Sequence, residues 1–156
     1  MSRNEEGMKI LFLSPLTGRS VSLEEVPDPV FSQKIIGDGM AVIPSDGRIV
    51  SPVDAQVVSV ADTAHAYGLK TEDGIELLIH AGIDTVKMNG EGFETFVETG
   101  AKVKKGDKLL SFDMDLVKEK GYKTQTMFLV ADAKGKEVEV VEVADADNNT
   151  KIMNLK

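Results

Sequence analysis

The chain contains two histidines, and histidine is the side chain best suited to chemistry near neutral pH. His65 lies in the segment 63–69, and His80 ends the apolar run 75–80. A neutral imidazole can act as a nucleophile, as a general acid or base, or as a metal ligand. What these two can do therefore depends on whether the fold brings them together.

A hairpin between the histidines would place both on one face of a sheet. An Asp-Gly pair at 73–74 is flanked by apolar runs, which is a signal for a two-residue turn. That turn would put Tyr67 opposite His80 and His65 opposite Gly82, so the two histidines would be diagonal neighbours about 7–8 Å apart. A three-residue turn would break this arrangement unless a bulge restored it.

The run that ends at His80 has two faces of different character. Ile75, Leu77 and Ile79 point one way and are expected to belong to the core. Leu78 and His80 point the other way. We therefore expect the histidines on the outer face or in a shallow depression beside Leu78, where a partner could reach them.

The residues alone leave several uses of such a pair open. A histidine on a strand is commonly structural, but two on one face favour a functional site. The pair could be a nucleophile with a helper, a general acid and base, or two metal ligands. A metal site needs a third or fourth ligand, and Asp84, four residues after His80, does not supply one by any strand spacing.

The elements around the histidines are predicted to be strands. Short apolar runs, many of them β-branched, are interrupted every 8 to 12 residues by Gly, Pro or Asp, which predicts an all-β, antiparallel sandwich or barrel-like single domain. One or two short helical turns are expected, at 115–121 and near 30–34. Residues 1–8 are predicted to form a flexible N-terminus and 9–156 one domain. The clearest predicted strands are 40–44, 56–60, 75–79, 108–112, 126–130 and 137–143, and 152–153 are predicted as a last one.

Composition excludes several classes of function. The net charge is −8, so phosphate backbones and anionic lipid surfaces would be repelled and a basic protein partner attracted. No cysteine is present, which rules out thiol catalysis and suits the cytoplasm. No apolar run approaches the ~20 residues of a membrane span, so membrane insertion is not expected.

The segment around His80 carries a resemblance to a known family. Residues 76–93, ELLIHAGIDTVKMNGEGF, resemble the active-site segment of glucose-type enzyme IIA domains of the bacterial sugar phosphotransferase system. Further stretches fall where that family has similar segments, and the resemblance covers roughly residues 14–143. These stretches are 26–39, 50–54, 63–69 and 103–107.

The resemblance implies a phosphoryl carrier. Such a protein accepts a phosphoryl group from the small protein HPr and passes it to a IIB domain of a sugar permease. By resemblance His80 is the phosphorylated residue and His65 its partner, whose loss is expected to spare acceptance more than onward transfer. The implied protein needs no cofactor and no metal, and we expect it to act as a monomer.

Four further residues are carried over by the same resemblance. Thr63 would orient the His65 ring through its hydroxyl, and the carbonyl of Gly82 would hold His80 in one tautomer. Asp38 and Asp84 would rim the site and receive an arginine from HPr. Either aspartate could instead be a simple turn or capping residue.

Two other classes remain as alternatives at this point. Lys87, next to a methionine, is the one feature that suits a biotinyl or lipoyl carrier, although the residues before it do not. A regulatory binding module, whose phosphorylation state reports sugar supply to target proteins, is compatible with the carrier function. The sequence does not identify the sugar.

Overall fold

The protein is a β-sandwich with short helical turns. The computed structural model describes residues 10–156, so the predicted flexible N-terminus lies outside the described residues. Within them, the all-β, antiparallel prediction is confirmed. The elements in chain order are β1 (Ile10–Leu13), β2 (Gly18–Ser22), the 3-10 helix η2 (Leu23–Glu25), α1 (Pro29–Ser32), β3 (Asp38–Pro44), β4 (Arg48–Val50), β5 (Ala55–Val60), β6 (Ala66–Lys70), β7 (Glu76–Ile83), the 3-10 helix η3 (Thr85–Met88), β8 (Phe93–Thr95), β9 (Lys102–Val103), β10 (Lys108–Phe112), α2 (Met114–Glu119), β11 (Lys123–Asp132), β12 (Val138–Val140) and β13 (Lys151–Leu155).

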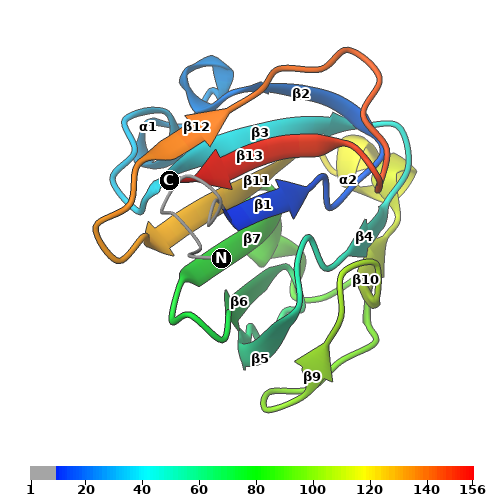
Figure 1. Ribbon diagram of the computed structural model, residues 1–156. Coiled ribbons are helices and arrows are strands. Elements are labelled where there is room, and N and C mark those ends of the chain that lie inside the picture. The colour runs from blue at the N-terminus through cyan, green and yellow to red at the C-terminus, as the bar shows by residue number, and fades with distance from the viewer. Residues whose placement is uncertain (1–9) are drawn as a thin grey trace, which may run out of the picture.

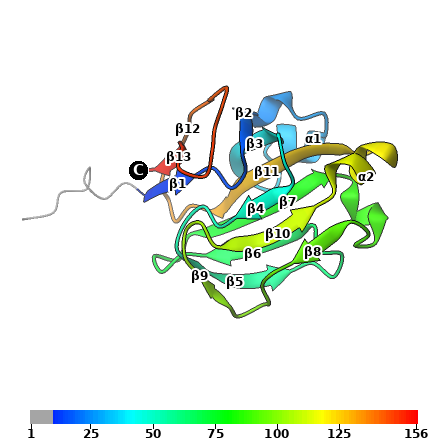
Figure 2. The same ribbon diagram turned by 90° about the vertical axis from the view of Figure 1, so that its right-hand side faces the viewer.

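A seven-stranded sheet forms the larger layer and carries the histidine strand near its middle. Its strand order is β2-β3-β11-β7-β6-β5-β9, and two three-stranded sheets, β1-β13-β12 and β4-β10-β8, complete the described fold. Figures 1 and 2 show β7 between β11 and β6, with the smaller sheets beside them. The main core lies between these layers, where for example Phe12 of β1 meets Phe128 of β11 with ring centroids 5.6 Å apart.

The face of β7 that points away from the main core rests on a second, smaller apolar cluster. Ile75, Leu77 and Ile79 lie in the main core, as predicted. Met127 and Leu129 of β11 point to the other face and pack there with Phe31 of α1. Both faces of β11 are therefore covered, which explains its unbroken apolar run.

The two helical turns are fixed by aspartate caps. Asp28 accepts a hydrogen bond from the Val30 N–H at 3.0 Å, and Pro29 occupies the first helical position, where its missing N–H costs nothing. Asp113 caps α2 in the same way, through the Leu116 N–H at 3.1 Å. Both turns were expected, and both begin one residue earlier than predicted.

The C-terminal part of the chain departs from the predicted strand over 137–143. β12 ends at Val140, because the Val143 N–H turns to the Ser20 hydroxyl at 2.7 Å instead of continuing the ladder. The predicted last strand at 152–153 is confirmed as β13, which lies between β1 and β12.

The predicted register of the β6–β7 hairpin is wrong by one residue. Ala66, rather than Tyr67, lies opposite His80. The turn has three residues, 72–74, closed by a hydrogen bond from the Thr71 N–H to the Ile75 carbonyl at 2.9 Å. Gly74 has φ +86, the left-handed position that a three-residue loop requires. The expected consequence of such a turn is that regular alternation would separate the two histidines.

Candidate active site

His80 presents one ring nitrogen to a fixed acceptor and leaves the other for chemistry. The side chain is partly exposed on β7, and its Nδ1 lies 2.8 Å from the Gly82 carbonyl oxygen. A carbonyl only accepts, so in the neutral ring Nδ1 carries the proton and Nε2 keeps its lone pair. The unprotonated Nε2 is the atom that a nucleophile needs.

The backbone conformation and close packing at position 82 require a glycine. Its φ is +81, and a Cβ there would lie 2.4 Å from the Thr85 methyl carbon and 2.9 Å from the Lys123 carbonyl oxygen. Any other residue would displace one of these groups. The tight backbone after His80 therefore also fixes the carbonyl to which its Nδ1 donates.

His65 reaches His80 despite the shifted register. It lies immediately before β6 and follows Ala64, whose φ of +60 is in the left-handed region. The His65 carbonyl still accepts a hydrogen bond from the Ala81 N–H of β7 at 2.7 Å, but the left-handed residue before it ends the regular alternation, so alternation does not fix the direction of its side chain. The two imidazole rings meet edge to face, with centroids 4.8 Å apart and an interplanar angle of 83°.

Thr63 contacts the inner nitrogen of His65. The Thr63 hydroxyl lies 2.5 Å from His65 Nδ1, and His65 is buried, with only 7% of its surface exposed. A hydroxyl can donate to that nitrogen or accept from it. When Thr63 donates, Nε2 of neutral His65 carries a proton that it can donate in turn.

Burial keeps both histidines neutral near pH 7. It is the main reason that the pKa of His65 is lowered to about 4, and the neighbouring His80 adds to the effect. Burial also lowers the pKa of His80, while the Gly82 carbonyl, Asp28 and Asp84 act in the opposite direction. His80 is thus available as a nucleophile at physiological pH.

The lowered pKa of His65 predicts a loss of stability in acid. The unfolded chain binds a proton near pH 6.5 and the folded one only near pH 4, so protons favour unfolding between these values. We expect the free energy of unfolding to fall by about 3 kcal/mol between pH 7 and pH 4 from this group alone. Urea titrations at both pH values give the free energy of unfolding of the wild type and of His65→Gln. The carboxylates destabilise both proteins in acid, so the difference between the two losses is the contribution of His65. Equal losses in the two would contradict the prediction.

The acidic residues of the site are not all those expected. Asp84 is exposed with φ +63 and makes no side-chain cap to η3, so its carboxylate is not used for local structure. Asp28, which sequence reasoning passed over, is the other acid whose charge raises the pKa of His80. The sequence feature that could have drawn attention to Asp28 is its place between two prolines at the start of a helical turn.

Asp38 lies farther from the histidines. His80 is opposite Met127 in the sheet, and Asp38 is opposite Val130 one strand beyond. Asp38 is therefore two strands and three residues from His80, roughly 10 Å across and 10 Å along the sheet. Its carboxylate is 3.5 Å from the Lys34 ammonium. A role for Asp38 at the rim stays a prediction.

Exposed apolar side chains lie on the segments that flank His80. Val30, Ile35 and Ile36 come from α1 and the residues after it, and Val86 comes from η3 directly after β7. Such side chains near a reactive group are suited to brief contact with a partner protein.

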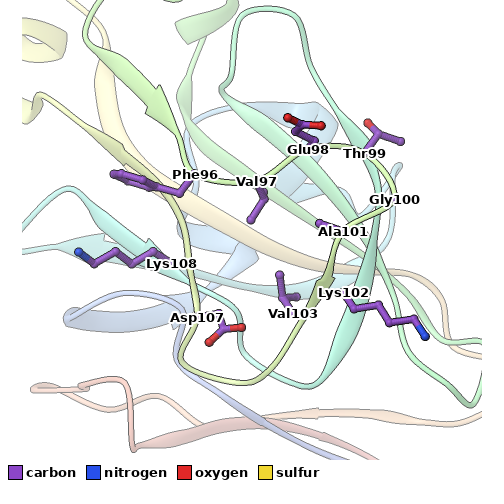
Figure 3. A pocket seen from close by; sticks show the side chains of 10 residues that line it. All are labelled: Phe96, Val97, Glu98, Thr99, Gly100, Ala101, Lys102, Val103, Asp107 and Lys108. Atoms are coloured by element: carbon purple, nitrogen blue, oxygen red, sulfur yellow. The ribbon is translucent and has the colours of Figure 1, made fainter.

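Other candidate sites do not involve the histidines. Within residues 10–156, no group of three or more His, Cys, Asp or Glu side chains is placed to hold a metal ion. Lys87 lies in η3 rather than at the tip of a hairpin between two strands, which does not favour a biotinyl or lipoyl carrier. A hollow of about 890 Å³ beside the β8–β9 loop is lined by residues such as Phe96 and Lys108, and neither histidine is among them (Figure 3). Over the same residues, the helices are all too short or too polar to span a bilayer.

Fold and site together define a small β-sandwich protein with a neutral, oriented histidine pair, and comparison with known proteins identifies its family. Residues 10–148 match the family model for the phosphoenolpyruvate-dependent sugar phosphotransferase system, EIIA 1. The chain belongs to this family.

Individual relatives agree with that assignment. A glucose-specific EIIA component from Bacillus cereus is 46% identical over 145 residues, which cover 92% of this chain and 88% of the relative. A glucose-specific EIICBA component from Staphylococcus saprophyticus is 44% identical, and the match covers 90% of this chain but 21% of that longer protein. The structure of glucose permease IIA from Mycoplasma capricolum superimposes with a TM-score of 0.92 at 32% identity, covering 99% of this chain and all of that one.

Proposed function

We propose that His80 Nε2 takes up a phosphoryl group and passes it to the IIB domain of a sugar permease. As a member of its family, the chain is a phosphoryl carrier in sugar transport. The observation that carries the assignment to His80 is its Nδ1 contact with the Gly82 carbonyl, which leaves Nε2 unprotonated. The reaction makes the protein a phosphotransferase component.

The transfer itself needs only positioning and charge stabilisation. His80 Nε2 attacks the phosphorus in line, a nitrogen–phosphorus bond forms, and the bond to the donor's leaving atom breaks. His80 keeps its Nδ1 proton, and the Gly82 carbonyl stabilises the positive charge that develops on the ring. An N–H of His65, 4.8 Å away between ring centroids, can donate to a phosphoryl oxygen.

We further propose that the donor is HPr and that it docks over His80. The net charge of −8 and the carboxylates of Asp28 and Asp84 would attract a basic partner and could receive its arginine. Ile35 and Val86 would supply apolar contact. Both transfers would be made by a monomer in the cytoplasm. The "glucose" in the names of the relatives makes a glucose-type permease the first candidate for the recipient.

Phosphoenolpyruvate, enzyme I and HPr, mixed with this protein, test the proposal directly. We expect the intact mass to rise by one phosphoryl group, ~80 Da, in a form that acid removes. Omission of HPr should prevent the gain. A protein that gains nothing while HPr itself becomes phosphorylated would share the fold of the family without this function.

A further inference from the structure

Phe31 is a buried aromatic residue that packs directly on His80. Its ring centroid lies 5.0 Å from that of His80, at an interplanar angle of 57°. Only 5% of its surface is exposed. The contact is therefore one between an interior side chain and the reactive imidazole.

Three groups then restrain the His80 ring from different directions. The Gly82 carbonyl oxygen lies 2.8 Å from Nδ1 of His80. The ring centroids of His65 and Phe31 lie 4.8 Å and 5.0 Å from that of His80. Rotation about the Cβ–Cγ bond of His80 would break the first contact and collide with the others. Nδ1 is the ring nitrogen that the hydrogen bond to Gly82 occupies, and within residues 10–156 Nε2 has no such bond.

Phe31 is itself held firmly enough to act as a restraint. It packs in the second apolar cluster with Met127 and Leu129 of β11. Its backbone belongs to α1, which Asp28 caps at 3.0 Å and which closes with a hydrogen bond from the Gln33 N–H to the Pro29 carbonyl at 3.0 Å.

We propose that Phe31 is a positioning residue for His80: it fixes the rotation of the imidazole, keeps water from the Nδ1–Gly82 hydrogen bond and thereby leaves Nε2 available to the phosphoryl donor. The inference deepens the proposed function and rests on it where it concerns the rate of transfer. The charged and titratable groups that act on His80 are His65, Asp28 and Asp84, and replacing Phe31 alters none of them chemically.

A role for Phe31 as part of a docking surface is a separate possibility with different consequences. Its 5% exposure leaves little for a partner to touch, whereas Ile35, close to it in sequence, is 67% exposed. Ile35→Ala is therefore the matched control. It removes apolar docking surface near His80 and leaves the His80–Phe31 contact in place.

The test compares Phe31→Leu, Phe31→Ala and Ile35→Ala by imidazole ¹⁵N NMR and by the rate of phosphoryl acceptance. Leu keeps most of the buried volume, so the experiment does not depend on the Ala variant folding. In the wild type we expect the neutral Nδ1–H tautomer of His80 alone. In the Phe31 variants we expect a mixture of tautomers and a higher pKa of His80, because water reaches the ring.

The rates separate positioning from docking. Phe31→Leu should lower kcat for acceptance about tenfold or more with little change in KM, as expected when a reacting group loses its orientation. Ile35→Ala should change KM and leave the His80 NMR signals unaltered. A folded Phe31→Leu variant with wild-type tautomer and pKa at His80 would overturn the proposal. The NMR result stands whether or not the wild type accepts phosphate, so failure of the proposed function would be seen separately.

Discussion

Replacing His80 with glutamine is expected to abolish the gain of a phosphoryl group while the protein stays folded. The side chain is partly exposed, and a glutamine amide can still donate to the Gly82 carbonyl, so that carbonyl keeps its hydrogen-bond partner. An amide nitrogen has no available lone pair, and the nucleophile is lost. Intact mass after incubation with phosphoenolpyruvate, enzyme I and HPr should equal that of a sample without enzyme I.

His65 is not expected to replace His80 in that variant. It is the more buried of the two, and when Thr63 donates to its Nδ1 the proton is on Nε2, which then has no lone pair for attack. His65→Gln, which keeps the His80 nucleophile, is the matched control and should still gain the group. An acid-labile gain of ~80 Da in His80→Gln would place the acceptor elsewhere.

Much of the fold follows from alternation along the strands. The division of residues 75–80 into a core face and a histidine face could be predicted, because successive side chains of a strand point to opposite sides. The topology of three sheets could not be predicted in this way. It depends on which strands pair over long sequence distances, as β3 does with β11.

The hairpin shows how a local signal can mislead. An Asp-Gly pair suits a two-residue turn and also the last positions of a three-residue turn, and the structure has the second. The histidines meet nevertheless, since Ala64 takes a left-handed conformation that no single-sequence rule assigns to alanine. The expectation that the two rings lie together was thus reached through an incorrect register.

Side-chain neighbours from distant segments were the hardest part of the site to predict. Thr63 and Gly82 lie within two residues of a histidine, so their contacts are local. Phe31 and Asp28 come from a turn far away in the sequence and reach His80 only because α1 packs against the sheet. The prolines on either side of Asp28 mark the start of a helical turn, but they do not show that it lies nearer to His80 than Asp38 does.

Replacing His65 with glutamine is expected to separate the two transfer steps. In the resting protein the pKa of His65 is about 4, so the ring is neutral when a phosphoryl group arrives and offers at most one N–H. A phosphoryl dianion on His80 favours the protonated form of a ring 4.8 Å away, so the phosphorylated protein begins onward transfer with a charged donor in place. The two steps also have different partners and hence different transition states.

The rate of acceptance from HPr should therefore fall less than about tenfold in His65→Gln. The rate of onward transfer to a IIB domain should fall about a hundredfold or more, which is the usual loss when one hydrogen-bond donor to a developing charge is removed. Single-turnover assays of each step with purified proteins measure the two rates separately. NMR titration of His65 before and after phosphorylation checks the cause, since its pKa should rise when His80 carries the group. Equal losses in both steps, or an unchanged pKa of His65, would show that the helper acts through its position alone and not through a change in its charge.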